Sequence, residues 1–291
     1  TILTVYVGGL RVISGELEVG HIFQFVFYVN LLTWPFASVG WVTSLVQKAE
    51  ASMRRINDFM EAKPAIQAPD ELEKGLVPST TEGLKFDRVS FTYPETGIEA
   101  VKNLSFQLIP GKILAVTGRT GSGKSTVAQL AMRIFDPHEG RIAFDGIPLQ
   151  QWPLNEFRSE TGYVPQDVFL FSDTIQRNIA FGLPEKDSMM REVQSAAEQA
   201  HVAHNIDAFE QKYETLLGER GVNLSGGQKQ RISIARALIR KPKLLILDDC
   251  LSAVDTETEE AILQSIRNQG DSTAVLMVSH RISSIRGADH V

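Results

Sequence analysis

The chain begins with a long apolar region and continues with short segments whose hydrophobic spacing alternates between strand and helix periodicity. No Lys, Arg, Asp or Glu occurs over residues 22–47. As a helix this stretch would be about 39 Å long at ~1.5 Å per residue, whereas the hydrocarbon core of a bilayer measures about 30 Å. The pattern predicts one complete membrane span over about 22–47, which Pro35 would kink rather than end. A buried helix of a soluble protein is the alternative.

Basic residues follow this apolar run and acidic residues precede it. Lys48, Arg54 and Lys63 come after the run, and Glu16 and Glu18 come before it. By the positive-inside rule, the chain beyond the span is cytoplasmic and the residues before the span are outside.

The residues on either side of the span are predicted to continue as helix. Residues 1–10 look like the last turns of a preceding membrane helix, so we expect the chain to be a fragment of a longer polypeptide. Residues 48–60 are mainly good helix formers and would carry the span into the cytoplasm. We therefore assign residues 1–62 to the C-terminal part of an all-α transmembrane domain.

The pattern changes after residue 62. Residues 63–82 combine prolines and a glycine with mixed charge, which is typical of a linker. Strands are then predicted near 84–91, 112–117, 141–145, 161–165, 243–248 and 273–279. Helices are predicted near 124–135, 172–181, 187–204, 226–240 and 256–269. This alternation predicts an α/β domain over 83–291 with a mostly parallel sheet, into which a helical subdomain is inserted over about 168–240.

Composition narrows the choice of partners. The formal net charge of -6 argues against a broad nucleic-acid-binding surface, so we expect no nucleic acid partner. Cys250 is the single cysteine, so no disulfide can form within the chain. We expect Cys250 to act as a small buried hydrophobe.

A glycine-rich loop follows the predicted strand at 112–117. The loop matches the G-x-x-x-x-G-K-[ST] pattern of a P-loop, in which backbone N–H groups and the positive end of the next helix surround phosphate oxygens. Lys124 would contact the β- and γ-phosphates, and the Ser125 hydroxyl would ligate Mg²⁺. A chance glycine turn is the alternative. The predicted nucleotide-binding residues of this segment are Gly118, Arg119, Thr120, Gly121, Ser122, Gly123, Lys124, Ser125 and Thr126.

Two further motifs are consistent with a P-loop ATPase. An apolar strand ends in Asp248, which would hold Mg²⁺ through water. Farther upstream, Ser225 would cap a helix whose first N–H groups stay open to an anion, because Gly226 and Gly227 carry no side chains. Gln228 belongs to the same motif.

Together, the P-loop, the acidic strand end and the Leu224–Arg231 segment resemble ATP-binding-cassette (ABC) exporters whose membrane and ATPase domains share one polypeptide. The resemblance covers essentially all of the chain. It implies an α/β P-loop nucleotide-binding domain, with a RecA-like core and a helical subdomain, preceded by the end of an all-α transmembrane domain. The C-terminal end of the ATPase domain is expected to be missing.

The resemblance also implies a function and a location. The cofactors would be ATP and Mg²⁺, and the function would be ATP-driven export of a drug, lipid or peptide. The location would be the lipid bilayer of a bacterial inner membrane, with the ATPase domain in the cytoplasm.

Four more residues receive roles from the resemblance alone. Tyr93 would stack on adenine, and Gln166 would contact Mg²⁺ and relay its presence to the membrane domain. Asp255 would lie in the loop that crosses to the opposite subunit, and His280 would contact the γ-phosphate. The alternatives are a core tyrosine, a surface glutamine, a simple helix cap and a structural histidine.

Asp249 departs from the family pattern, which has Glu at this position as the base that polarises the attacking water. Asp is shorter by one methylene, roughly 1.5 Å, and proton abstraction needs a hydrogen-bond reach of about 2.6–3.2 Å. We therefore predict a weakened catalytic site. The alternative is that the backbone shifts and that Asp249 still works.

The resemblance implies that two such domains close head to tail, with each ATP between one P-loop and the signature motif of the other domain. Together with Asp249, it favours the degenerate-site half of a heterodimer with a second ABC half-transporter. A homodimer is the first alternative, and a largely non-hydrolysing regulatory half is the second. A soluble ABC-type ATPase of DNA maintenance is disfavoured by the apolar run.

Overall fold

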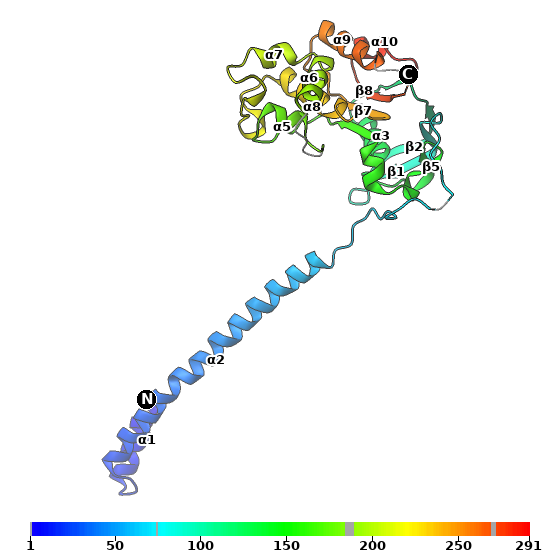
Figure 1. The fold of residues 1–291 in the computed structure, drawn as a ribbon. Helices are drawn as coiled ribbons and strands as arrows, with labels where there is room; N and C mark the ends of the chain where they lie inside the picture. The colour runs from blue at the N-terminus through cyan, green and yellow to red at the C-terminus, as the bar shows by residue number, and fades with distance from the viewer. Residues whose placement is uncertain (1, 74, 184–188, 269–271) are drawn as a thin grey trace. The chain divides into compact units, whose positions relative to one another are not determined.

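The chain forms two compact units, Thr1–Ala65 and Ile66–Val291. The structure is a computed structural model (Figure 1), and it describes residues 2–73, 75–183, 189–268 and 272–291. The division between the units falls within the segment predicted as a linker.

The first unit consists of two helices, α1 (Ile2–Ile13) and α2 (Val19–Met60). α2 continues through Pro35 without a break. Neither helix has a buried residue, and large apolar side chains such as Trp34 and Phe36 are mostly exposed. Among the described residues, α2 is the one helix that is long and apolar enough to cross a membrane.

The second unit contains two four-stranded sheets that differ in strand direction. The parallel sheet has the order β3-β8-β7-β6 and consists of β3 (Ile113–Val116), β6 (Thr161–Val164), β7 (Leu244–Asp248) and β8 (Ala274–Val278). The antiparallel sheet has the order β2-β1-β4-β5 and consists of β1 (Leu84–Thr92), β2 (Glu99–Leu108), β4 (Glu139–Phe144) and β5 (Ile147–Pro148).

This second sheet corrects the prediction of a mostly parallel fold, which holds for only one of the two sheets. Alternation of apolar residues predicts a strand but carries no information about the direction of its neighbour. β2 was missed altogether because its inward and outward positions do not alternate regularly.

The helices predicted after residue 83 are present and shorter than predicted, as α3 (Lys124–Ala131), α5 (Ile175–Ile179), α6 (Met189–Gln199), α8 (Gly226–Leu238) and α9 (Thr256–Arg267). Three short helices were not predicted as separate elements, namely α4 (Leu154–Ser159), α7 (Ala203–Asp207) and α10 (Ile282–Arg286). Short 3₁₀ turns occur at Leu149–Gln151, Lys212–Glu214 and Glu219–Gly221. The predicted helical positions 187, 188 and 269 lie outside the described residues.

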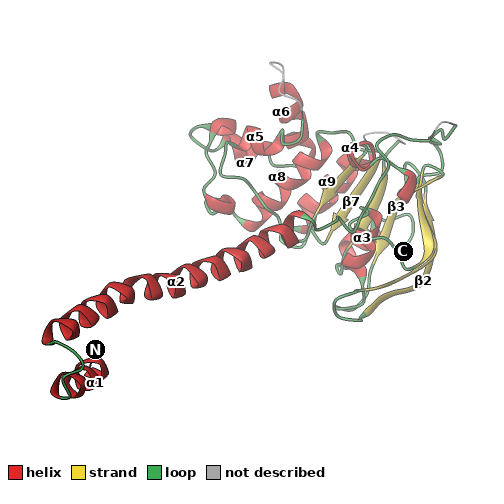
Figure 2. Cartoon of the chain, turned by 90° about the horizontal axis from the view of Figure 1, so that it is seen from below, coloured by secondary structure: helices red, strands yellow, loops and turns green. Residues whose placement is uncertain are grey.

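Helices α5, α6, α7 and α8 gather on one side of the second unit (Figure 2). Contacts join α8 to both α5 and α6, and α8 also contacts β6 of the parallel sheet. The helix that carries the Ser225 motif is therefore attached directly to the sheet that carries the P-loop.

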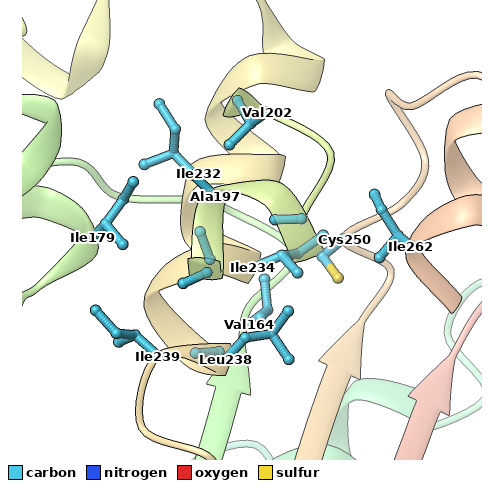
Figure 3. Close-up of a cluster of buried hydrophobic side chains, with 14 of the residues drawn as sticks. Val164, Ile179, Ala197, Val202, Ile232, Ile234, Leu238, Ile239, Cys250 and Ile262 are labelled. Atoms are coloured by element: carbon cyan, nitrogen blue, oxygen red, sulfur yellow. The ribbon is translucent and has the colours of Figure 1, made fainter. Parts of the chain in front are cut away.

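Both faces of the parallel sheet are covered by apolar clusters. In β7, Leu245 and Leu247 belong to one cluster, and Leu244 and Ile246 belong to the other. Burial on both faces explains why this strand is a continuous apolar run. Figure 3 shows part of the first cluster, which includes Cys250. This thiol is buried, as predicted.

Candidate nucleotide-binding site

The predicted P-loop connects the end of β3 to the beginning of α3. Its glycines adopt backbone conformations that residues with a side chain rarely adopt. Gly123 has a φ of 85°, and a Cβ at this position would lie 2.1 Å from the carbonyl oxygen of Ala100. Gly121 also has a positive φ, of 81°. The loop therefore depends on glycine for its shape.

Lys124 folds back over this loop. Its ammonium group donates hydrogen bonds to the carbonyl oxygens of Gly118, at 2.8 Å, and Arg119, at 2.9 Å. The ammonium is thus held over the loop, and its contact with a phosphate stays a prediction.

Ser125 and Asp248 meet at the carboxyl edge of the parallel sheet. The Ser125 hydroxyl donates to Oδ1 of Asp248 at 3.0 Å, although the two residues lie 123 positions apart. Their elements come together because β8 pairs with both β3 and β7. Two of the three predicted Mg²⁺ residues, Ser125 and Asp248, are thus direct neighbours.

Asp248 is 3% exposed. Burial raises its pKa, and the neighbouring Asp249 adds to that rise, while hydrogen bonds from Ser125 and Tyr163 oppose it. A carboxylate in this environment is stabilised by a nearby cation, so Asp248 and Ser125 fit a bound Mg²⁺. No group of three or more His, Cys, Asp or Glu side chains that could hold a metal ion occurs in the described part of the chain. The ion would therefore take its other ligands from phosphate, from water and from Gln166, as the resemblance implies.

Tyr163 was missed by the sequence reasoning. It lies in β6, next to β7, and its hydroxyl donates to Asp248. Burial raises the pKa of Tyr163 to about 12, and the charge of Asp248 contributes to this shift. The only signal in the sequence was its position three residues before Gln166.

Asp249 and His280 also come together. Nδ1 of His280 lies 2.9 Å from Oδ1 of Asp249. That oxygen is buried but receives no hydrogen bond of suitable geometry from the described residues. The contact is thus close but poorly directed as a hydrogen bond. Asp249 also has a φ of 48°, a left-handed conformation that is uncommon for a residue with a side chain.

Tyr93 contacts α3 as well as the antiparallel sheet. Its hydroxyl is 2.9 Å from Oγ1 of Thr126 and donates to Gln129 at 3.1 Å. Its ring makes edge contacts with Phe91 and Phe135. The hydroxyl groups of Thr126 and Tyr93 are therefore hydrogen-bonded to each other. Stacking of adenine on Tyr93 stays a prediction.

The remaining predicted residues lie apart from the P-loop. Ser225 caps α8, and its side chain and that of Gln228 accept each other's backbone N–H. The Ser225 cap and Gly226 are exposed, and a Cβ on Gly227 would lie 2.9 Å from the carbonyl oxygen of Ala253. In the described structure, no hydrogen bond or ion pair joins this motif to the P-loop.

Asp255 and Gln166 are likewise exposed. Asp255 caps α9 by accepting the N–H of Thr258 at 2.9 Å, which lowers the pKa of its carboxyl. Gln166 follows β6. Both residues are available to a partner.

Comparison with known proteins gives consistent matches. A family model described as "ABC transporter" matches residues 101–252. The multidrug resistance-like ATP-binding protein MdlA of Escherichia coli is 41% identical over 284 residues, covering 98% of this chain and 47% of MdlA. The probable multidrug resistance ABC transporter ATP-binding/permease protein YheI of Bacillus subtilis is 39% identical, covering 97% of this chain and 47% of YheI.

Two further matches are a lipid flippase and a solved structure. The ATP-dependent lipid A-core flippase of Alkalilimnicola ehrlichii is 36% identical, covering 99% of this chain and 48% of the flippase. A solved structure of a bacterial Atm1-family ABC exporter with ATP bound has a TM-score of 0.78 and 35% identity, and it covers 99% of this chain and 49% of that one. The chain thus spans about half the length of these relatives. More than half of it matches the family model, and the chain belongs to the ABC transporter family.

Proposed function

We propose that this chain is the nucleotide-binding half of a membrane-embedded exporter, in which ATP binding and hydrolysis drive transport. The observation that carries the proposal is the 3.0 Å hydrogen bond between Ser125 and buried Asp248, directly beside Lys124 and the P-loop. This arrangement supplies phosphate donors and hard oxygen ligands at one point. The long apolar helix α2, with its exposed side chains, provides the membrane attachment.

The residues of this chain would act in sequence. Lys124 exchanges the carbonyls of Gly118 and Arg119 for phosphate oxygens. Ser125 and Asp248, with Gln166, hold Mg²⁺, which neutralises charge on the phosphates when bound. Tyr93 supports the adenine.

Asp249 and His280 would handle the attacking water. The Asp249 carboxylate would accept a hydrogen bond from that water, and the neighbouring His280 would contact the γ-phosphate. Because Asp is shorter than Glu, the carboxylate lies farther from the water, and hydrolysis at this site is slow.

The exposed Ser225 motif and Asp255 would serve a second nucleotide-binding domain. A partner with its own P-loop would place its ATP against Ser225, Gly226, Gly227 and Gln228. We favour a heterodimer, because Asp249 weakens only the site that this chain supplies. The transported molecule would be a drug, lipid or peptide.

A second candidate is a largely non-hydrolysing, ATP-binding regulatory half. One observation favours it, namely Asp at position 249, where the family usually has Glu.

The test is ATP turnover by the purified full-length polypeptide in detergent, alone and with the adjacent encoded half-transporter, beside Asp249→Glu. Asp249→Asn is the matched control, because it removes the base without changing length. Low turnover that rises with Glu or with the partner supports the degenerate site. Robust turnover alone, unchanged by Glu, contradicts it and favours a homodimer. Failure of ATP to bind at all would refute the nucleotide-binding function.

A further inference from the structure

The loop that begins at Asp249 is held by an arginine outside the predicted motif residues. Arg281 directly follows His280, and its Nη1 donates to the carbonyl oxygens of Leu251, at 2.9 Å, and Val254, at 2.8 Å. The same nitrogen donates to Oε2 of Glu259 at 3.1 Å. One guanidinium group therefore binds both the loop and the helix that follows it.

Glu259 is fully buried in α9. Besides Arg281, its carboxylate accepts hydrogen bonds from Ser283, at 3.1 Å, and from Ser284. A buried carboxylate with one cation and two hydroxyl donors is satisfied, and removal of one partner would leave charge uncompensated. The network thus fixes Arg281 in a single place.

This network reaches both residues of the proposed hydrolytic pair. Ser279, on the other side of His280, accepts the N–H of Arg281 at 3.1 Å and donates to Ser284 at 3.0 Å. His280 is therefore bracketed by two anchored residues, and its Nδ1 lies 2.9 Å from Asp249. A shift of Arg281 would move His280 and the loop together.

A second anchor holds the same loop from the side of α8. Gln230, which is buried, accepts the N–H of Ala253 at 3.1 Å and lies 3.4 Å from the Ser252 hydroxyl. That hydroxyl donates to the carbonyl oxygen of Asp249 at 3.0 Å. The loop is therefore held on one side by the neutral amide of Gln230 and on the other side by the Arg281–Glu259 pair.

We propose that Arg281 is a positioning residue that, with Glu259, fixes the loop over 251–254 and the spacing between His280 and Asp249. The inference rests on the proposed ATPase function, because the spacing matters only if this pair handles water and phosphate. Arg281 touches neither the P-loop nor Asp248 in the described structure, so it should affect the hydrolytic step and not ATP binding.

The test variant is Arg281→Lys, which keeps the charge beside Glu259 but loses the planar donor group. Because this chain's own site is slow with Asp249, the readout is the rate that Asp249→Glu adds to turnover of the full-length protein with its partner. We expect Arg281→Lys to lower this added rate about tenfold, with KM for ATP changed less than about twofold. Glu259→Gln, which keeps the side-chain shape, is a second variant with the same expected direction. Glu259→Gln keeps the inference testable if Arg281→Lys folds poorly.

Arg133→Lys is the matched control. Arg133 is 2% exposed, pairs with Asp136 at 3.1 Å and donates to the carbonyl oxygen of Gln67 at 2.7 Å. It therefore makes the same kinds of contact away from the loop. We expect it to lower thermal stability without changing the added rate.

Hydrogen exchange of the full-length chain without nucleotide separates this inference from the proposed function. In Arg281→Lys the amides of Ala253 and Val254 should exchange about tenfold faster, with no change in β1. Faster exchange in Arg281→Lys, together with a wild-type protein that hydrolyses no ATP, would support the anchor and refute the ATPase. Unchanged exchange, or an equal fall of the added rate in Arg133→Lys, would overturn the inference.

Discussion

Asp248→Asn should separate two properties of Asp248. One is the cost of its buried charge to the stability of the fold, and the other is its contribution to Mg²⁺ binding. The carboxyl is 3% exposed, and burial together with the charge of Asp249 raises its pKa. The folded chain without metal therefore keeps an unfavourable buried charge at neutral pH. Asn has nearly the same shape and can still accept the hydrogen bond from Ser125, so the substitution removes the charge without leaving a cavity.

The sign of the effect and its dependence on pH follow from linkage. A raised pKa stabilises the fold below the pKa of the unfolded chain, near 3.8, and this stabilisation is lost as the pH rises through the folded pKa. Single substitutions commonly change stability by about 0.5–3 kcal/mol. We expect Asp248→Asn to gain on the order of 1 kcal/mol at pH 7 without metal, which would raise Tm by about 2–4 °C in a unit of this size.

The assay is thermal unfolding of wild type and Asp248→Asn, with chelator or with Mg²⁺ and ATP, between pH 4 and pH 8. The variant should be more stable in chelator, should lack the loss of stability with rising pH, and should gain little from Mg²⁺. Asp87→Asn is the control, because Asp87 forms ion pairs with exposed Arg88 and Arg141 and should change Tm little. Lower stability of Asp248→Asn in chelator, or an undiminished Mg²⁺ response, would refute the reasoning.

Three further substitutions test other parts of the site. Gly123→Ala places a Cβ 2.1 Å from the Ala100 carbonyl at a φ of 85°, so it should cost about 1–3 kcal/mol in urea unfolding and abolish binding of a fluorescent ATP analogue; retained binding would contradict the required loop shape. Tyr163→Phe removes a donor to Asp248 and should raise the Mg²⁺ concentration for half-maximal turnover about tenfold; an unchanged Mg²⁺ titration would exclude a role for this hydroxyl. Ser225→Ala removes the α8 cap and should cost about 1 kcal/mol in urea unfolding. Ser195→Ala is the control, because Ser195 lies within α6 and does not cap a helix.

The sequence was most informative where chemistry requires fixed spacing. The P-loop places Lys124 and Ser125 within one motif, and Asp248 ends an apolar run, so their proximity could be predicted without a structure. The resemblance to ABC exporters predicts that His280 contacts the γ-phosphate, and this stays a prediction. The structure places its imidazole beside Asp249.

Contacts between distant elements could not be predicted in this way. Tyr163 reaches Asp248 because β6 pairs with β7, and Arg281 reaches Glu259 because α10 contacts α9. Neither pair has a local spacing that marks it in the sequence. The antiparallel sheet was missed for a similar reason, since the direction of a strand depends on chain path and not on its own residues.

The positions of the motif residues suggest how the homodimer and heterodimer can be distinguished. Lys124, Ser125 and Asp248 lie together within one chain, whereas the Ser225 motif is exposed and has no contact with them in the described structure. In a homodimer, Asp249 of one copy and Ser225 of the other would face the same ATP. Changes at the two positions would then act on one catalytic step, and their effects on turnover would be strongly non-additive.

In a heterodimer the same two changes in this chain act on different nucleotides. Asp249→Glu alters the site that this chain's P-loop builds, while Ser225→Ala weakens the site built by the partner's P-loop. Total turnover is then the sum of two sites, so Asp249→Glu should add nearly the same absolute rate with or without Ser225→Ala. If Ser225→Ala instead removes the gain from Asp249→Glu, both residues act at one site, and the heterodimer with a degenerate site is wrong.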